Sequence, residues 1–299
     1  MKKRSGGASP DGSSSLIGDI TDTARLIAFY RAVESERSDA LFRDPFARLL
    51  AGKRGEEIAR RLPGARQSAW ITSVRTRVLD EMIMQMVDGG IDRVDTVLNL
   101  AAGLDTRPYR LALPASLKWI EVDLPAILAY KQEKLADEQS SCLLERIPLD
   151  LALNGERKRL FARVGAEAQR LMVITEGFLL YMMPDQVAAL ANDLYAVPSF
   201  AWWLTDLAPP AMVKMLSPAL RSHLARGRVQ MQFAPEEGAA FFRSSGWSIA
   251  EFRGSEEETR RLCREMPFGW LLGLLIGLAA RNGQQAVSKT GGFLLLARE

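Results

Sequence analysis

A short apolar segment followed by a turn of very small residues constrains the fold of this chain more than any other feature. Residues 94–98 (VDTVL) have the length and β-branched character of a strand, and a helical segment starts near Pro108. Between them, positions 101–103 are Ala-Ala-Gly, and side chains this small let the backbone approach a ligand closely. Twenty residues after Gly103, a second apolar run ends at Asp123. This spacing is typical of a βαβ nucleotide site, where such a carboxylate accepts hydrogen bonds from ribose hydroxyls.

The turn favours a nucleoside ligand over a dinucleotide. A dinucleotide site uses a Gly-x-Gly-x-x-Gly turn and points a helix N-terminus at a pyrophosphate. Here the turn has a single glycine, and Asp105 stands at the start of the helix. Its carboxylate would repel a phosphate but could accept a hydrogen bond from an ammonium group, so we predict S-adenosylmethionine as the cofactor rather than NAD. Alternatively, Asp105 or Thr106 only caps the helix, and the two roles can coexist.

Composition excludes several classes of protein. The 299 residues are 47% hydrophobic, which is enough for one large or two small globular domains. The formal net charge is +3, and residues 1–15 account for two of these charges with three basic residues and one acidic residue. The body is therefore nearly neutral, and we expect no nucleic-acid partner. Two cysteines and one histidine predict neither a disulfide framework nor a metal site.

The hydrophobic pattern predicts three regions: a disordered tail over 1–15, a helical cap over 16–90, and an α/β domain over 91–299 with a lid insertion around 210–245. Strands are expected at 94–100, 117–122, 143–148, 171–176, 200–206, 246–252 and 292–297, and helices near 124–137, 155–165 and 184–195. This alternation predicts an α/β fold with a Rossmann-like, seven-stranded, mostly parallel sheet. We expect the last strand to be an antiparallel edge strand.

Residues 266–280 contain no charged side chain. A membrane span needs about 20 apolar residues, so we expect a buried core helix, or else a wall of an apolar substrate or dimer pocket. We predict no membrane partner, a cytoplasmic location because the N-terminus lacks an apolar leader, and leave a homodimer open.

Several segments, in the same order, resemble the leucine carboxyl methyltransferase family, in particular its bacterial branch of polyketide O-methyltransferase-like enzymes. The similar segments are 38–45 (SDALFRDP), 75–77 (RTR), 98–111 (LNLAAGLDTRPYRL), 121–125 (EVDLP), 148–151 (PLDL) and 175–181 (TEGFLLY). They cover about 38–185, and no signature of the family follows position 210. The resemblance implies a class I methyltransferase fold over 91–299 and S-adenosylmethionine as cofactor.

The resemblance also implies roles for single residues. Arg75 would bind the methionine carboxylate, Ala101 to Gly103 would form the floor, Asp123 would bind the ribose, Asp150 and Leu151 would contact the adenine, and Glu176 would lie near the amino group. The family usually has glycine at the position of Ala101. The chemistry of arginine supports the role of Arg75, because a guanidinium donates two parallel hydrogen bonds to a carboxylate. Arg75 and Arg77 point in different directions on a helix, so only one of them can do this.

Methyl transfer from a sulfonium depends mostly on holding the acceptor close to the methyl group. The catalytic candidates are Tyr181, which could orient an acceptor, and His223, the single histidine, which could act as a base. A packing role for Tyr181 and a surface position for His223 are the alternatives. The shortage of bases favours a carboxylate acceptor, which is already ionised at neutral pH.

The aromatic pairs 202–203 and 241–242 suggest an apolar acceptor, although they could equally belong to the core. We therefore expect an O-methyltransferase that acts on a small apolar carboxylate or phenol of natural-product type. An NAD(P)-dependent oxidoreductase and a non-catalytic protein with a methyltransferase fold are the alternatives.

Overall fold

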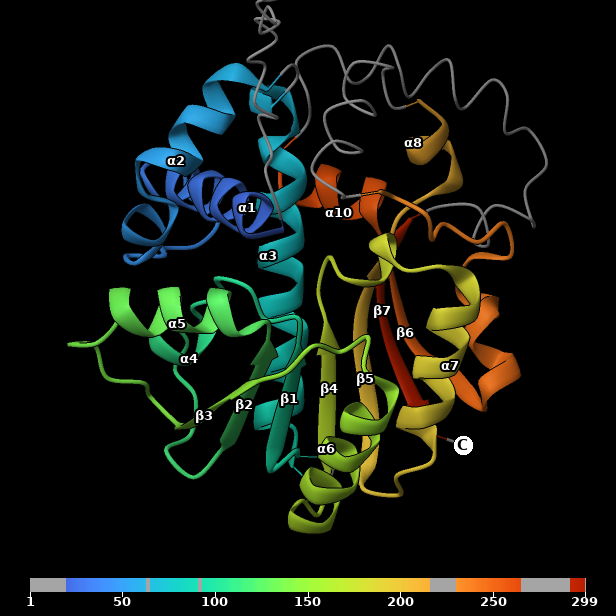
Figure 1. Cartoon of the computed structure of the whole chain (residues 1–299). Helices are drawn as coiled ribbons and strands as arrows, with labels where there is room; N and C mark the ends of the chain where they lie inside the picture. The colour runs from blue at the N-terminus through green and yellow to red at the C-terminus, as the bar shows by residue number, and fades with distance from the viewer. Residues whose placement is uncertain (1–19, 63–64, 91–92, 216–229, 265–290, 299) are drawn as a thin grey trace, which may run out of the picture.

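The computed structural model describes residues 20–62, 65–90, 93–215, 230–264 and 291–298. A single sheet runs through the molecule and has helices on both faces (Figure 1). Its strands are β1 (Thr96–Leu100), β2 (Lys118–Asp123), β3 (Leu143–Pro148), β4 (Leu171–Thr175), β5 (Phe200–Leu207), β6 (Trp247–Gly254) and β7 (Gly292–Arg298). The α-helices are α1 (Ile20–Ser35), α2 (Ala47–Arg61), α3 (Ala65–Asp88), α4 (Arg107–Arg110), α5 (Pro125–Lys134), α6 (Asn154–Glu167), α7 (Pro184–Tyr195), α8 (Pro210–Met215) and α10 (Ser255–Arg261). The described residues also include the 3-10 helices η2 (Leu179–Tyr181) and η3 (Gly238–Ser245).

The sheet has seven strands in the order β3-β2-β1-β4-β5-β7-β6. The first five strands are parallel, and β7 pairs antiparallel with both β5 and β6. The predicted Rossmann-like, seven-stranded, mostly parallel sheet is confirmed. After β3 the chain crosses back to the other side of β1, so that β2 and β4 flank β1. Open α/β sheets bind ligands at such a position.

The prediction that the last strand lies at the edge is wrong. β7 is antiparallel as expected, but it lies between β5 and β6, and β6 is the edge strand. The cause is burial, because Phe293–Leu296 are apolar and buried in succession, which requires cover on both sides. β6 is only partly buried along most of its length, as suits an edge strand.

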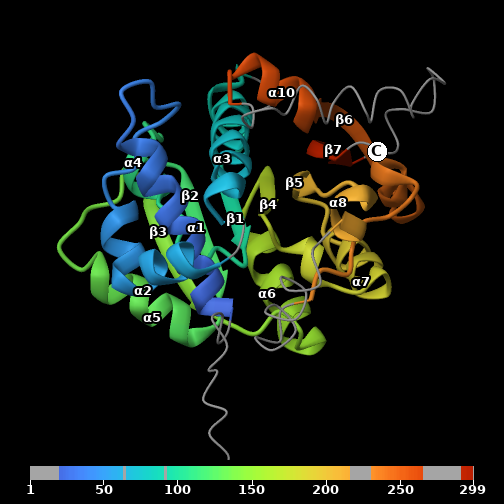
Figure 2. The same cartoon turned by 90° about the horizontal axis from the view of Figure 1, so that it is seen from above.

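The two faces of the sheet pack against different helices. α3 covers one face, where Val78 and Met82 belong to the same buried cluster as Trp119 of β2. α6 and α7 cover the other face and contribute Phe161 and Leu190. α1 and α2 pack against each other over the half of the sheet that holds β1, β2 and β3 (Figures 1 and 2). They thereby lie beyond the ligand-binding end of the sheet.

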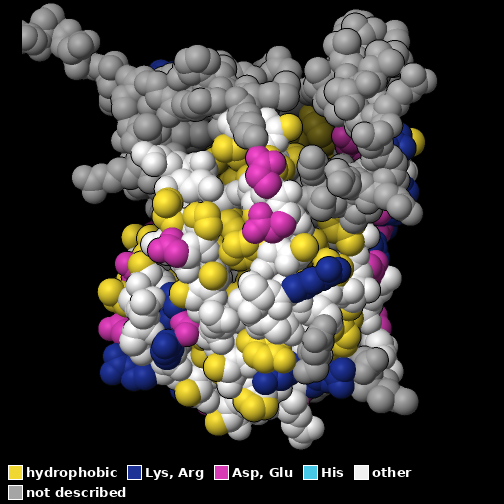
Figure 3. Space-filling view, turned by 90° about the vertical axis from the view of Figure 1, so that its right-hand side faces the viewer, with side chains coloured by type: hydrophobic (Ala, Val, Ile, Leu, Met, Phe, Trp, Pro, Cys, Tyr) yellow, Lys and Arg dark blue, Asp and Glu magenta, His cyan; other side chains and the backbone are white. Residues whose placement is uncertain are grey.

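Several predictions concern residues outside those described. These are the tail over 1–15, the uncharged segment 266–280 and, within the expected lid, residues 216–229. In the part of the chain that the structure describes, no helix is long and apolar enough to cross a membrane. On the face shown in Figure 3, basic side chains are dispersed among acidic and apolar ones. That the chain has no nucleic-acid partner stays a prediction. Whether it forms a homodimer stays open.

Helix α6 offers a matched test of packing against the turn before β5. A Cβ at Gly165 would lie 2.2 Å from Val197 Cγ1, whereas a Cβ at Gly155 in the same helix would meet nothing within 4 Å. Helix propensity alone favours alanine at both positions by up to about 1 kcal/mol. We therefore expect Gly155→Ala to leave the free energy of unfolding unchanged or slightly raised. Gly165→Ala should lower it by about 1–3 kcal/mol, because α6 or the turn must shift. Urea denaturation of both variants measures this, and equal stability of the two would contradict the packing account.

Candidate functional site

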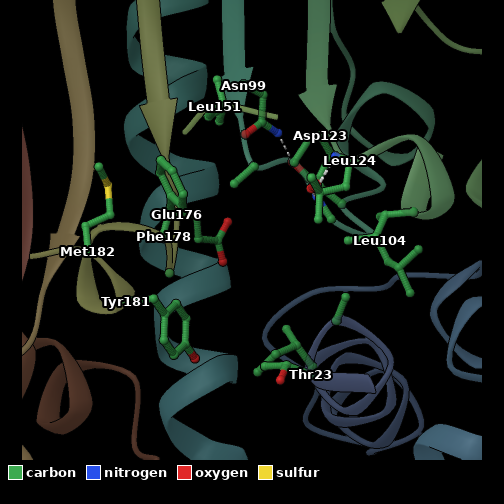
Figure 4. Close-up of a pocket in the computed structure, with 18 of the residues that line it drawn as sticks. Thr23, Asn99, Leu104, Asp123, Leu124, Leu151, Glu176, Phe178, Tyr181 and Met182 are labelled. Carbon is green, nitrogen blue, oxygen red and sulfur yellow. Dashed lines mark hydrogen bonds between the residues drawn. The ribbon is translucent and has the colours of Figure 1, made fainter. Parts of the chain in front are cut away.

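A cavity of about 640 Å³ lies at the carboxyl ends of the parallel strands. Its walls come from α1, α3, the turn after β1, the start of α5 and the segments that follow β3 and β4 (Figure 4). Every predicted site residue within the described part of the chain lines it: Arg75, Ala101, Gly103, Asp105, Asp123, Asp150, Leu151, Glu176 and Tyr181. His223 lies outside the described residues. Residues chosen from separate sequence segments therefore share one cavity.

The small-residue turn after β1 is held by a carboxylate from β2. Asp123 Oδ2 accepts a hydrogen bond of 2.6 Å from the Gly103 amide, and Ala101 and Gly103 have φ angles of 54° and 50°. A non-glycine residue in this left-handed region costs about 1–2 kcal/mol. The strain at Ala101 gives a physical reason why glycine would suit this position better. It also shows that the turn is fixed by its surroundings, since local preference opposes it.

The carboxylate of Asp123 holds the turn and still has acceptor positions left for hydrogen bonds from a ligand. Its Oδ1 accepts a second backbone hydrogen bond, from the Leu124 amide at 2.7 Å. A carboxylate offers about four acceptor positions, so about half remain. Burial raises the pKa of Asp123 and outweighs the two amide donors, which lower it. A buried acceptor of this kind suits the hydroxyl groups of a ribose.

Arg107, which the sequence analysis did not assign, lies at the centre of the site. Its side chain is 2% exposed and contacts three carboxylates. Nε donates to Asp80 Oδ1 at 2.7 Å, and Nη1 donates to Asp105 Oδ2 at 3.0 Å and to Glu176 Oε2 at 2.6 Å. Arg110 closes the arrangement by donating two hydrogen bonds to Asp80. The available signal was the position of Arg107 inside the family-like segment 98–111.

Asp105 stabilises the start of helix α4, which was one of the two roles that the sequence allowed for it. Its Oδ1 accepts from the Arg107 amide at 3.0 Å, and its Oδ2 also accepts from Asn99 Nδ2 at 2.9 Å. Burial alone would raise the pKa of Asp105, but the nearby guanidinium of Arg107 outweighs it and holds the pKa well below its usual range. With three donors besides any ligand, Asp105 mainly fixes the start of α4, and contact with a cofactor stays a prediction.

Arg75 lines the cavity and contacts two carboxylates. Its Nε donates to Glu176 Oε1 at 2.9 Å, and its Nη1 lies 3.4 Å from Asp206 Oδ2. Arg77 points elsewhere, because its Nε binds Glu81 and its side chain is 43% exposed. The helix thus directs one arginine of the pair toward the cavity.

Glu176 bridges Arg75 and Arg107 at the end of β4, with one oxygen on each. Burial alone would raise its pKa, but the charges of the two arginines prevail and lower it. Across the full cluster, three guanidiniums meet four carboxylates, counting Asp80, Asp105, Glu176 and Asp206. With all groups ionised, the cluster carries one excess negative charge, which favours a ligand that carries positive charge.

The remaining predicted residues lie at the two ends of the cavity. Asp150 is exposed after β3 and accepts from the Ala152 amide at 2.9 Å, and the next residue, Leu151, is buried. At the other end, Figure 4 shows the Tyr181 ring across the cavity from Thr23 of α1. Burial raises the pKa of Tyr181, so its hydroxyl stays protonated at neutral pH. In the part of the chain described, no group of three His, Cys, Asp or Glu side chains could hold a metal ion.

Comparison with known proteins places this geometry in context. Residues 24–195 match the family model described as Leucine carboxyl methyltransferase. A provisionally named S-adenosyl-L-methionine-dependent methyltransferase of Streptomyces coelicolor is 36% identical over 179 residues, which are 56% of this chain and 62% of that protein. A similarly named protein of Mycolicibacterium gilvum is 29% identical over 237 residues, covering 72% of this chain and 76% of the relative. The match to the Streptomyces relative thus spans about three fifths of its length.

Solved structures share the fold. A DUF574-family protein from Streptomyces avermitilis superposes with a TM-score of 0.58 at 12% identity and covers 93% of this chain and 97% of its own. A provisionally named methyltransferase from Thermobifida fusca gives 0.53 at 14% identity and covers 97% and 98%. These similarities extend over nearly the whole chain, so they support the class I methyltransferase fold that the sequence implies.

The Arg107 cluster generates a prediction about pH. Arg107→Met should lower the free energy of unfolding by about 3–5 kcal/mol near neutral pH, because it leaves buried carboxylates without their cation. In the wild type, the lowered pKa values of Glu176 and Asp105 contribute stability that is lost as the pH falls through the acid range. In the variant, these carboxylates should instead bind protons more readily folded than unfolded, so its stability should recover as they protonate. The deficit should therefore be largest near neutral pH and shrink toward about pH 5.

Urea denaturation at several pH values measures this difference. Arg60→Met is the control, since Arg60 is 62% exposed and its nearest ion pair, with Glu56, spans 3.9 Å. We expect its effect to be within about 0.5 kcal/mol at every pH. A deficit for Arg107→Met that does not depend on pH would mean that packing, and not charge, explains the burial of Arg107.

Proposed function

The chain belongs to the leucine carboxyl methyltransferase family, and we propose that it is an S-adenosylmethionine-dependent O-methyltransferase. The observation that carries the proposal is the placement of Arg75. Arg75 lines the cavity beside Glu176, to which its Nε donates a hydrogen bond, and Asp123 lines the same cavity. A cation that can bind a carboxylate therefore stands next to acids that can bind an ammonium group and a ribose.

The residues present fit this cofactor along the edge of the sheet. Asp150 and Leu151, after β3, would contact the adenine, and Asp123, at the end of β2, would bind the ribose hydroxyls. Arg75 and Glu176 would then bind the carboxylate and the ammonium group of the methionine moiety. A cavity of about 640 Å³ is within the range of small-molecule sites. The excess negative charge of the cluster matches a ligand with a sulfonium and an ammonium group.

The alternatives draw less support from the site. A pyrophosphate at the start of α4 would meet the buried carboxylate of Asp105, which argues against a dinucleotide-dependent oxidoreductase. A non-catalytic protein would have no need for an arginine in the wall of this cavity. Binding of S-adenosylhomocysteine, the demethylated product, distinguishes all three possibilities.

The chemistry needs little from the protein besides position. The cofactor supplies an activated methyl group, so the chain contributes mainly by holding the acceptor oxygen in line with it and by excluding water. Ile27, Phe178 and Met182 give the cavity an apolar wall, which supports an apolar acceptor. The aromatic pairs 202–203 and 241–242 are not among the residues that line the cavity, and their side chains pack in or against the core.

We expect Arg75→Lys to weaken the binding of S-adenosylhomocysteine by about tenfold or more, because a point charge cannot reproduce the bidentate guanidinium. Arg77→Lys is the matched control, since it lies two positions away on the same helix and faces away from the cavity. Its affinity should equal that of the wild type within about twofold. Isothermal titration calorimetry measures both. A larger loss of affinity in Arg77→Lys than in Arg75→Lys would show that the cofactor carboxylate binds elsewhere.

A panel of acceptors tests the proposed reaction. The purified chain, incubated with methyl-labelled cofactor, should methylate apolar phenols or apolar carboxylic acids on oxygen and should leave a peptide that ends in leucine unmodified. The reason is the apolar wall together with the near-neutral charge of the body, which offers no field for a polar peptide. Mass spectrometry of the products measures transfer, and turnover of the peptide alone would contradict the proposal.

A further inference from the structure

A partly buried carboxylate that the proposed cofactor does not use lies beside the site. Asp206 is near the end of β5, and its side chain is 21% exposed. Its Oδ1 accepts a hydrogen bond of 2.6 Å from the Gly177 amide, and its Oδ2 faces Arg75 at 3.4 Å. Both of these partners line the cavity. Asp206 is thus a partly exposed carboxylate in contact with two residues of the cavity wall.

The order of the strands indicates what should bind near Asp206. The proposed cofactor runs from adenine after β3, through ribose at β2, to the methionine moiety between β1 and β4. β5 is the next strand along this edge. The acceptor must approach from beyond the methionine moiety, since the other side is occupied by the rest of the cofactor. We propose that Asp206 is a catalytic residue that hydrogen-bonds a hydroxyl group of the acceptor and takes its proton during methyl transfer.

This inference rests on the proposed function and adds a base that the sequence analysis lacked. The expectation of a carboxylate acceptor came from the shortage of bases, with His223 as the single histidine. An acceptor carboxylate at this place would lie close to both Asp206 and Glu176, and the like charges would repel it. A hydroxyl group would instead donate a hydrogen bond to Asp206. The geometry therefore favours an apolar phenol or alcohol over an apolar acid.

The charged groups around Asp206 suit a base. Burial raises its pKa, Arg75 on α3 lowers it, and Glu176 after β4 raises it again, with a net rise. Among the described residues, Tyr181 on η2 is a further titratable neighbour, and burial keeps it protonated. The contact of 3.4 Å with Arg75 is longer than the 2.9 Å contact between Arg75 and Glu176. A cofactor carboxylate bound to Arg75 would weaken this longer contact further and would make Asp206 more basic.

The reaction balances without another reactant. The acceptor oxygen forms a bond to the methyl carbon as the carbon–sulfur bond breaks, and the electron pair of that bond stays on sulfur. The hydroxyl proton moves to Asp206, so the positive charge of the sulfonium and the negative charge of the carboxylate disappear together. Release of the proton to solvent after the products leave restores the carboxylate.

The test uses the full chain, methyl-labelled S-adenosylmethionine, and two probes matched in size, 2-naphthol and 2-naphthoic acid. The wild type should methylate the naphthol faster than the acid. Asp206→Asn should lower the rate with naphthol by about 100-fold or more and abolish the acid limb of its pH–rate profile. Asp206→Glu should restore part of the rate. Asp137→Asn removes an exposed carboxylate after α5 and should match the wild type.

Two measurements separate catalysis by Asp206 from a merely structural role. Asp206→Asn should bind S-adenosylhomocysteine as tightly as the wild type or more tightly, because Arg75 loses a competing partner. In the wild type, carbon NMR of labelled aspartate should show the pKa of Asp206 rising when S-adenosylhomocysteine binds. An unchanged pKa, equal rates for Asp206→Asn and the wild type, or a preference for naphthoic acid would each overturn the inference. Failure of the wild type to bind S-adenosylhomocysteine would instead contradict the proposed function.

Discussion

The buried guanidinium of Arg107 is the interaction on which the site depends. It joins Asp80 on α3, Asp105 after β1 and Glu176 after β4, so that one side chain ties together three separate segments of the chain. Taking these charges out of water is costly, and only their mutual contacts offset that cost. The arrangement is therefore intolerant of displacement. It fixes Glu176, and Glu176 in turn accepts a hydrogen bond from Nε of Arg75, which lines the cavity.

A second constraint acts on the backbone. Asp123 reaches from β2 to the Gly103 amide and holds the turn after β1 in a conformation that Ala101 adopts only under strain. The turn leaves room beside β1 because no large side chain stands there. The ion pairs of Arg107 and the hydrogen bond between Asp123 and Gly103 thus act at the same place, where β1 lies between β2 and β4. The cavity forms at this place.

The sequence predicted the strands well because a buried parallel strand is a local pattern: an apolar run bounded by turns. β3 and α7 occur at the predicted residues, and the other parallel strands shift by only one or two positions. Site residues at strand ends were also predictable, because parallel strands end at the same edge. Arg107 and Asp206 escaped notice since their importance comes from partners distant in sequence, up to 131 positions for Arg75 and Asp206. The place of β7 between β5 and β6 depends on pairing in the same way.

The central claim is that Arg75 and Asp123 hold the two ends of the ribose–methionine part of one cofactor. A crystal structure of the chain with S-adenosylhomocysteine tests it most directly. We expect the ligand carboxylate on the terminal nitrogens of Arg75, the ribose hydroxyls on Asp123, and the adenine beside Leu151. A ligand whose carboxylate binds Arg31 or Arg157, with its ribose away from Asp123, would contradict the account.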